Sequence, residues 1–241
     1  MLHDTHCHFD AYDDPSAELA AVSKAGIRAT WVTMSPASFA AAQRVAAGMN
    51  GIDIAAGLHP LEAAAREDEL PTLLEQIAET RWVGEVGLDF VTEDEENREA
   101  QRRVFRAVLE RCDQLGGRVI TIHSRRSAGQ VLDLLGDGHP GAVLHWFSGD
   151  ETALERALAQ RRWYSVNTAM VRSSTRRTMV AQMPADRVLL ESDGPYIEID
   201  GRPARPRDGE LVVQHLASLW GRSREDVRGQ LSENYAELTG G

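Results

Sequence analysis

WVGEVGL, residues 82–88, is a short apolar run of the kind that forms a buried β-strand. The segment 97–115 that follows it repeats apolar side chains at i, i+4, i+8 and i+11, starting at Val104, which is helical spacing. A Gly-Gly pair at 116–117 ends that helix, and RVITIH (118–123) is again strand-like. This order predicts a strand–helix–strand unit, whose strands run parallel and are covered by helices.

The same unit recurs along the whole chain. Strand-like runs lie at 2–9, 27–34, 52–58, 82–88, 118–123, 142–147, 163–167 and 187–192. Helices are expected at 16–25, 36–48, 61–79, 97–115, 126–135, 150–160, 174–182, 210–220 and 223–238. Eight units in 241 residues favour a closed (β/α)8 TIM barrel over an open doubly wound sheet, an α/β fold forming a single domain over residues 1–241.

Composition limits the classes of function. The net charge of −11 argues against bulk electrostatic binding of nucleic acid, so any such contact must be local. An uninterrupted apolar run of membrane-spanning length does not occur, and the chain opens on a strand-like segment rather than a signal peptide. Two cysteines imply no disulfide framework. We therefore expect a cytoplasmic protein that does not enter a membrane.

Polar side chains able to bind a metal ion gather at the ends of the predicted strands. They are His6, His8, His59, Glu85, Asp89, His123, His145 and Asp193. In a (β/α)8 barrel the carboxyl ends of all strands meet at one rim, the face that carries catalysis. Because side chains alternate along a strand, His6 and His8 point the same way and can share one ion. The pattern therefore predicts a metal site at this rim.

The ligand types indicate a two-metal centre. Imidazole combined with carboxylate suits zinc, manganese or iron. Two ions about 3.5–4 Å apart need a bridging group, and Glu85 is the natural one because it lies between the two sets of histidines. A carbamylated lysine is excluded as the bridge, since the only lysine, Lys24, lies in a predicted helix.

The charge of such a centre indicates the substrate. Two divalent ions and two carboxylates leave about +2 in an otherwise acidic protein, which favours an anionic substrate. Arg125 and Arg126 directly follow His123, and a guanidinium can form paired hydrogen bonds with phosphate. A phosphate ester is therefore the leading substrate class.

At these residues the chain resembles the TatD family of metal-dependent deoxyribonucleases. The resemblance covers essentially the whole chain and rests on HDTHCHFD (3–10), GLHP (57–60), GEVGLDF (84–90), IHSR (122–125), HWFSG (145–149) and ESDGPY (191–196). It implies a hydrolase that cleaves phosphodiester bonds of DNA as a 3′–5′ exonuclease or single-strand DNase, with two divalent ions (Zn, Mg or Mn).

The resemblance also implies a role for each residue. His6 and His8 would hold one ion with Asp193, and His123 and His145 would hold the second. Glu85 would bridge the ions, and Asp193 would also accept the proton of the attacking water. His59 and Arg125 would contact the scissile phosphate. Trp146 or Phe147 could stack on a terminal base. From the residues themselves, Asp89 is expected to orient the site or cap a loop, while Asp4 and Asp10 are expected to lie behind the ligands or in loops and to fix imidazole tautomers.

Several positions depart from the family pattern: Trp146, Asn167, Ser192, Gly194 and the GRPARP stretch at 201–206. None removes a predicted ligand.

The combination of HSRR, HWFSG and SDGP looks most like the TatD-like member of the Qat anti-phage defence system, which implies protein partners in a defence complex. Two alternatives stay open at this point: a small-molecule amidohydrolase or deaminase, and a structural subunit of such a complex.

Overall fold

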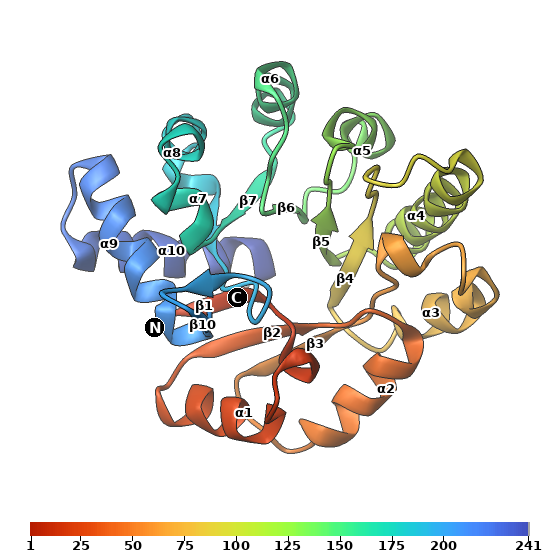
Figure 1. The fold of residues 1–241 in the computed structure, drawn as a ribbon, viewed down its shortest axis with the longest axis horizontal. Coiled ribbons are helices and arrows are strands. Elements are labelled where there is room, and N and C mark those ends of the chain that lie inside the picture. Colours follow the sequence, from red (N-terminus) through yellow and green to blue (C-terminus); the bar gives the residue numbers. More distant parts are fainter. Residues whose placement is uncertain (241) are drawn as a thin grey trace. The chain divides into compact units, whose positions relative to one another are not determined.

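The computed structural model describes residues 1–240, in which eight parallel strands alternate with helices (Figure 1). The strands are β1 (His3–Cys7), β2 (Arg28–Val32), β3 (Ile52–Ala55), β4 (Trp82–Gly87), β5 (Val119–His123), β6 (Ala142–His145), β7 (Trp163–Val166) and β8 (Val188–Leu190). Each lies inside its predicted run. A separate pair of short strands, β9 (Glu198–Ile199) and β10 (Arg202–Pro203), is antiparallel and was not predicted.

The chain divides into two compact units. The first comprises Met1–Trp31, Arg44–Asp53 and Trp163–Gly241, and the second comprises Val32–Gln43 and Ile54–Arg162. The strand order is β2–β1–β8–β7 in the first unit and β6–β5–β4 in the second. Every pair described within these two series is parallel.

The end of β3 is joined to β4 within the second unit. Ala56, directly after β3, forms a parallel bridge with Val83. Its backbone N–H donates to the Trp82 carbonyl at 3.1 Å, and its carbonyl accepts from the Gly84 N–H at 2.8 Å. This bridge brings the segment after β3, which carries His59, beside the strand that carries Glu85.

The helices follow the predicted periodicity except at 61–79 and at Thr168–Arg172, where the helix was not predicted. They are α1 (Pro15–Lys24), α2 (Pro36–Val45), α3 (Leu70–Gln76), α4 (Glu95–Leu115), α5 (Ala128–Leu135), α6 (Glu151–Ala159), α7 (Thr168–Arg172), α8 (Ser174–Val180), α9 (Gly209–Trp220) and α10 (Arg224–Thr239). In Figure 1, α4 and α5 lie along the outer side of β4 and β5. Each of these helices is too short or too polar to cross a lipid bilayer, in the part of the chain that is described.

The predicted helix at 61–79 is confirmed only over Leu70–Gln76 and is wrong before it. The structure has 3-10 turns at Pro60–Glu62 and Glu67–Glu69, and only then the short helix α3. Pro71 lies in the first turn of α3, the one place in a helix where the missing N–H of proline costs nothing. A continuous helix through this position would lose a hydrogen bond, so the segment is broken.

Packing follows the apolar stripes. In α4, Val104, Phe105, Val108 and Leu109 are all at most 3% exposed, which confirms the stripe read from the sequence. In the first unit, α10 is tied to β8 through Asn234, whose amide donates to the carbonyls of Ala185 and Val188 at 2.8 and 2.6 Å. These contacts hold the strands whose carboxyl ends carry the candidate site.

Candidate metal centre

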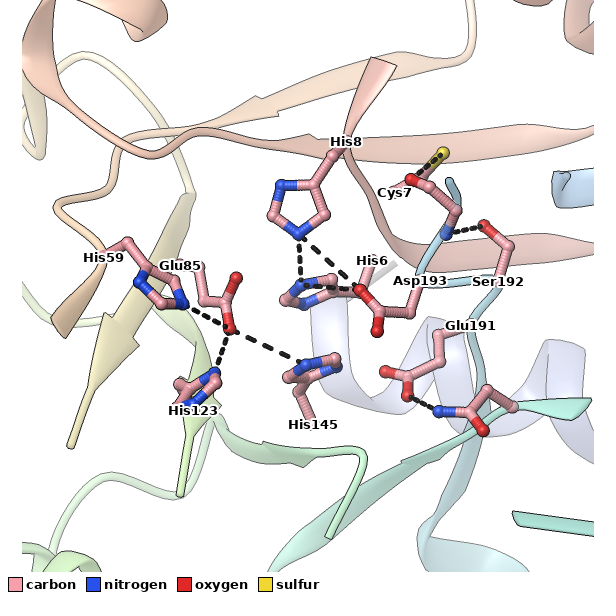
Figure 2. A network of polar contacts seen from close by, with 12 residues as sticks. His6, Cys7, His8, His59, Glu85, His123, His145, Glu191, Ser192 and Asp193 are labelled. Carbon is pink, nitrogen blue, oxygen red and sulfur yellow. Dashed lines mark hydrogen bonds and ion pairs between the residues drawn. The ribbon is translucent and has the colours of Figure 1, made fainter. Parts of the chain in front are cut away.

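The first unit brings three of the predicted ligands together. His6 lies near the end of β1, His8 follows that strand, and Asp193 follows β8. The two Nε2 atoms are 3.3 Å apart, and Asp193 Oδ1 lies 3.9 Å from His6 Nε2 and 3.6 Å from His8 Nε2 (Figure 2). All three residues are at most 3% exposed. We call His6, His8 and Asp193 the first cluster.

Backbone contacts between β1 and the segment after β8 position this cluster. The Asp193 N–H donates to the His6 carbonyl at 3.0 Å, and the His8 N–H donates to the Gly194 carbonyl at 2.8 Å. Asp4 supports both chains, since its Oδ1 accepts from the N–H groups of His6 and Ser192 at 3.1 and 3.0 Å. The ligands are thus held by main-chain hydrogen bonds on both sides.

Two carboxylates expected to orient imidazoles do something else. Asp4 holds backbone N–H groups, and its burial raises the pKa of that carboxyl to about 7. Asp10 accepts a hydrogen bond from the Trp31 indole at 3.1 Å, away from both histidines. The prediction that they fix imidazole tautomers is therefore wrong for the contacts described.

The second unit brings together Glu85 and three histidines around one oxygen atom. Glu85 Oε1 lies 2.5 Å from His123 Nδ1, and 3.6 Å from both His59 Nε2 and His145 Nε2 (Figure 2). Glu85 is 2% exposed, which places its carboxylate out of bulk water. We call His59, Glu85, His123 and His145 the second cluster.

His123 is held between two carboxylates. Its Nδ1 contacts Glu85, and its Nε2 lies 2.9 Å from Asp89 Oδ2. Burial opposes the charged imidazole, but the Glu85 charge and the hydrogen bonds to Asp89 and Glu85 outweigh it and raise the pKa of His123 to about 9. This is the orienting role predicted for Asp89, because one bonded nitrogen of a ligand histidine fixes the ring and presents the other.

His59 differs from the other histidines in its hydrogen bonding. Its Nδ1 accepts from the Leu61 N–H at 3.2 Å. In a neutral imidazole one nitrogen accepts and the other donates, so the proton resides on Nε2, the atom that faces Glu85. An Nε2–H donor suits contact with an anion better than it suits binding a cation.

Close packing around residue 57 explains why the GLHP segment begins with glycine. A Cβ atom at this position would lie 2.4 Å from the Glu85 backbone nitrogen and 2.3 Å from the Thr33 carbonyl oxygen. Any larger residue would force the segment that carries His59 away from β4. Glycine therefore permits the close approach of His59 and Glu85.

Both clusters have the donor chemistry of a metal site. The candidate ligand atoms of His6, His8 and Asp193 lie within 4.8 Å of one another. In the second cluster, Glu85 Oε1 lies 2.5 Å from His123 Nδ1 and 3.6 Å from His145 Nε2. Buried imidazole and carboxylate groups at this spacing suit a divalent transition metal ion. The residues present therefore fit the metal that the sequence predicts.

Comparison with known proteins agrees with this chemistry. The sequence profile of the TatD related DNase family matches residues 3–240. The chain belongs to the TatD family. The human deoxyribonuclease TATDN3 is 26% identical over 98% of this chain and 94% of its own length. The 3′-5′ ssDNA/RNA exonuclease TatD of Erwinia billingiae is 33% identical over 76% of each chain.

A solved structure shows the fold of this TatD-family chain. The YjjV protein of Escherichia coli K12, a TatD homologue, matches with a TM-score of 0.86 at 27% identity, over 98% of this chain and 97% of its own. The predicted fold class, α/β with eight parallel strands alternating with helices, is confirmed. Metal-dependent hydrolases stand among the curated relatives, as for YabD of Bacillus subtilis at 26% identity over 99% of this chain and 98% of its own length.

The predicted substrate-binding residues of the TatD-family chain differ in exposure, and His59 is buried, being 6% exposed. Arg125 is exposed and follows β5. Trp146 is partly exposed, and its ring makes an edge contact with His145 at 6.4 Å between centroids. Phe147, the other aromatic proposed to stack on a base, is 0% exposed and therefore cannot do so.

Sequence reasoning missed Tyr196. This side chain is 56% exposed, and its ring makes an edge contact with His8 at 4.9 Å between centroids. It follows the cluster residue Asp193 in ESDGPY, a segment without strand or helix periodicity. The position of the motif next to a predicted ligand was the only available signal.

One departure from the family pattern has a physical cause. A Cβ at Gly194 would lie 1.9 Å from the Tyr12 hydroxyl and 2.3 Å from the Ala204 carbonyl oxygen. Tyr12 donates a hydrogen bond to that carbonyl. The tyrosine hydroxyl therefore fills the space that an alanine or serine side chain would need.

Proposed function

We propose that this TatD-family chain is a metal-dependent phosphodiesterase that removes nucleotides from the 3′ end of single-stranded DNA. The observation that carries the proposal is the second cluster, in which one buried carboxylate oxygen has three imidazole nitrogens within 3.6 Å. The exonuclease named among the relatives supplies the substrate class and polarity.

The two clusters would hold two divalent ions, Zn, Mg or Mn. His6, His8 and Asp193 would hold one, and His123 and His145 the other, with Glu85 as the bridge that the family resemblance assigns. When bound, such ions lower the pKa of a water molecule toward neutrality and neutralise charge on the phosphate. Asp89 would keep His123 in place, since it already holds the Nε2 nitrogen.

The protein's own groups would handle protons and the phosphate. Asp193 would accept the proton of the attacking water and return one to the leaving oxygen. The Nε2–H of His59 would donate to a phosphoryl oxygen, as its tautomer favours. Arg125 would stabilise the negative charge that develops there.

Two aromatic side chains would bind the terminal nucleotides. Tyr196 contacts His8 and Trp146 contacts His145, so each exposes a ring beside one cluster. A base stacked on an aromatic ring gains about 1–3 kcal/mol whatever its identity. This fits a substrate strand with accessible ends and no required sequence.

The test is an assay on single-stranded DNA labelled at either end, with Mg²⁺, Mn²⁺ or Zn²⁺. We expect stepwise shortening from the 3′ end by the wild type and by Glu93→Gln, an exposed acid outside both clusters. Glu85→Gln should be inactive. Absence of cleavage with every metal, or full cleavage by Glu85→Gln, would overturn the proposal, and shortening from the 5′ end would overturn its polarity.

Two further readings remain as predictions. The defence role rests only on the HSRR, HWFSG and SDGP combination, and adjacent genes for an ATPase and a nucleotide-modifying enzyme would support it. The cytoplasmic location rests on composition.

Two alternative functions have distinct outcomes. Hydrolysis of cyclic amides in place of phosphodiesters would favour the amidohydrolase alternative, and a chain that binds no metal would favour a structural subunit.

A further inference from the structure

A cavity of about 420 Å³ lies in the second unit, at the starts of α5 and α6. Ser124 and Ser148 are among the residues that line the cavity. Ser124 directly follows His123 at the end of β5, and Ser148 lies shortly after His145 at the end of β6. The cavity is therefore lined by residues that closely follow His123 and His145 along the chain. Its volume is in the range of pockets that bind a small ligand, about 300–1,000 Å³.

The start of α5 faces this cavity without a capping side chain. Ser127, at the N-cap position, makes no capping hydrogen bond, because its hydroxyl donates to the Leu88 carbonyl at 2.6 Å. The first residues of the helix, Ala128 to Gln130, line the cavity. Backbone N–H groups at a helix start lack intrahelical partners and favour an anion.

Ser124 is a second, independent indication of a ligand. The residue is 4% exposed and lines the cavity. Its hydroxyl forms no hydrogen bond with another residue of 1–240. A buried hydroxyl that faces an open cavity is suited to a ligand that accepts a hydrogen bond.

One positive charge in the cavity, that of Arg126, is available to a ligand. Arg126 and Arg156 line it, and Asp150 is its one carboxylate within the described chain. Arg126 is exposed and forms no ion pair with residues 1–240, so its guanidinium is available. Arg156 is paired with Asp133 at 2.5 Å, and Asp150 caps α6 by accepting from the Ala153 N–H at 2.8 Å.

We propose that this cavity binds a phosphate group of the nucleic-acid strand next to the scissile one, through Arg126, Ser124 and the start of α5. The proposal rests on the proposed function, because it extends the strand's path from the second cluster. A phosphodiester provides the acceptors that a guanidinium, a hydroxyl and backbone N–H groups require together.

The experiment measures binding of fluorescently labelled dT8 by anisotropy with Mg²⁺ present, and the strand carries phosphorothioate linkages so that it resists hydrolysis. Arg126→Ala should weaken binding about tenfold, the effect of losing one charge-assisted hydrogen bond. The slope of log affinity against log salt should fall by about 0.7, as for one single-strand phosphate contact. Ser124→Ala should weaken binding less. Arg44→Ala removes an exposed arginine of α2 outside the cavity and should change neither value.

The outcomes separate the possibilities. Equal affinities for Arg126→Ala and Arg44→Ala, or no binding of dT8 by the wild type, would overturn the proposal. If Arg126 governs binding of inorganic phosphate or thymidine monophosphate but not of dT8, the cavity is a small-anion site and the strand assignment is overturned. Hydrolysis of bis(4-nitrophenyl) phosphate with metal tests the proposed function separately, and the control Arg44→Ala should leave it unchanged.

Discussion

The two clusters hold their histidines in different ways. In the first cluster, Asp193 Oδ1 stays 3.6–3.9 Å from both imidazoles, and main-chain hydrogen bonds position the residues. In the second, His123 Nδ1 lies 2.5 Å from Glu85 Oε1 and His123 Nε2 lies 2.9 Å from Asp89 Oδ2. Main-chain hydrogen bonds also position the second cluster, where the Glu85 and His59 N–H groups each donate to a backbone carbonyl at 3.1 Å. The second cluster differs in that side-chain carboxylates additionally hold both nitrogens of His123.

This difference predicts which substitution should most reduce metal binding at each cluster. Glu85 contacts three imidazoles, whereas Asp193 contacts two. Loss of the Glu85 carboxylate therefore changes the surroundings of more candidate ligands. Removing Glu85 should therefore disrupt metal binding broadly, whereas removing Asp193 should act locally. The expected effects below run from the largest to the smallest.

The largest effect should follow loss of the Glu85 carboxylate. Glu85→Gln keeps the size of the side chain but removes the charge that faces His59, His123 and His145. Activity should fall about a thousandfold or more, because metal ions contribute several kcal/mol of transition-state stabilisation. Metal analysis should show a greater loss of bound ions than in Asp193→Asn. If Asp193→Asn loses as much metal as Glu85→Gln, the contrast between the clusters fails.

An intermediate effect should follow loss of Asp89. Asp89→Asn weakens the grip on His123 Nε2 without touching a proposed ligand. Metal affinity, measured by titration with Zn²⁺ or Mn²⁺, should fall about 10–100-fold, the usual cost of losing such a partner. Asp10→Asn is the matched control, since Asp10 contacts Trp31 instead. Unchanged affinity in Asp89→Asn would show that Glu85 alone orients His123.

A smaller effect should follow loss of the exposed aromatic rings. Tyr196→Ala and Trp146→Ala remove the rings beside the first and second cluster, respectively. Each should raise the KM for single-stranded DNA about 5–150-fold, corresponding to 1–3 kcal/mol of stacking. Tyr196→Phe keeps the ring and should behave like the wild type. An effect of Tyr196→Phe as large as that of Tyr196→Ala would mean that the hydroxyl matters and not the ring.

The smallest effect concerns His3, a histidine outside both clusters. It stacks on Tyr235 at 3.9 Å, and burial, followed by the charge of Arg28, lowers the pKa of His3 from 6.5 to about 4. Between these values the unfolded chain binds a proton that the folded chain does not, so the free energy of unfolding falls as pH falls from 6.5 to 4. The contribution is about 1 kcal/mol after allowance for partial exposure.

Replacing His3 with phenylalanine tests this contribution. His3→Phe keeps a ring against Tyr235 but cannot be protonated. Urea unfolding at several pH values should therefore show a shallower loss of stability in this variant than in the wild type. Identical slopes in both proteins would show that His3 titrates alike in the folded and unfolded chains.

Much of the fold was predictable because the pattern is periodic. Apolar runs gave all eight strands, and helical spacing gave nearly every helix. The failure at 61–79 arose because an apolar pattern was followed across Pro71, which can only begin a helix. The short helix α7 was missed because its Asn167 cap, whose Oδ1 accepts from the Met170 N–H at 3.0 Å, follows directly on β7.

The candidate ligands were predictable because parallel strands end on one side, so strand ends identify neighbours. Contacts that depend on side-chain direction were not. Asp4 was expected to face an imidazole but binds backbone N–H groups. Arg125 and Arg126 are adjacent in sequence, yet only Arg126 lines the cavity at α5. Its backbone has a positive φ of 55°, which nothing in the sequence indicated.

The most direct test of the central claim is anomalous X-ray diffraction from crystals grown with Mn²⁺ or Zn²⁺. The account predicts one ion bound by His6, His8 and Asp193, and another bound by Glu85, His123 and His145. Anomalous signal at only one cluster, or at neither, would contradict it.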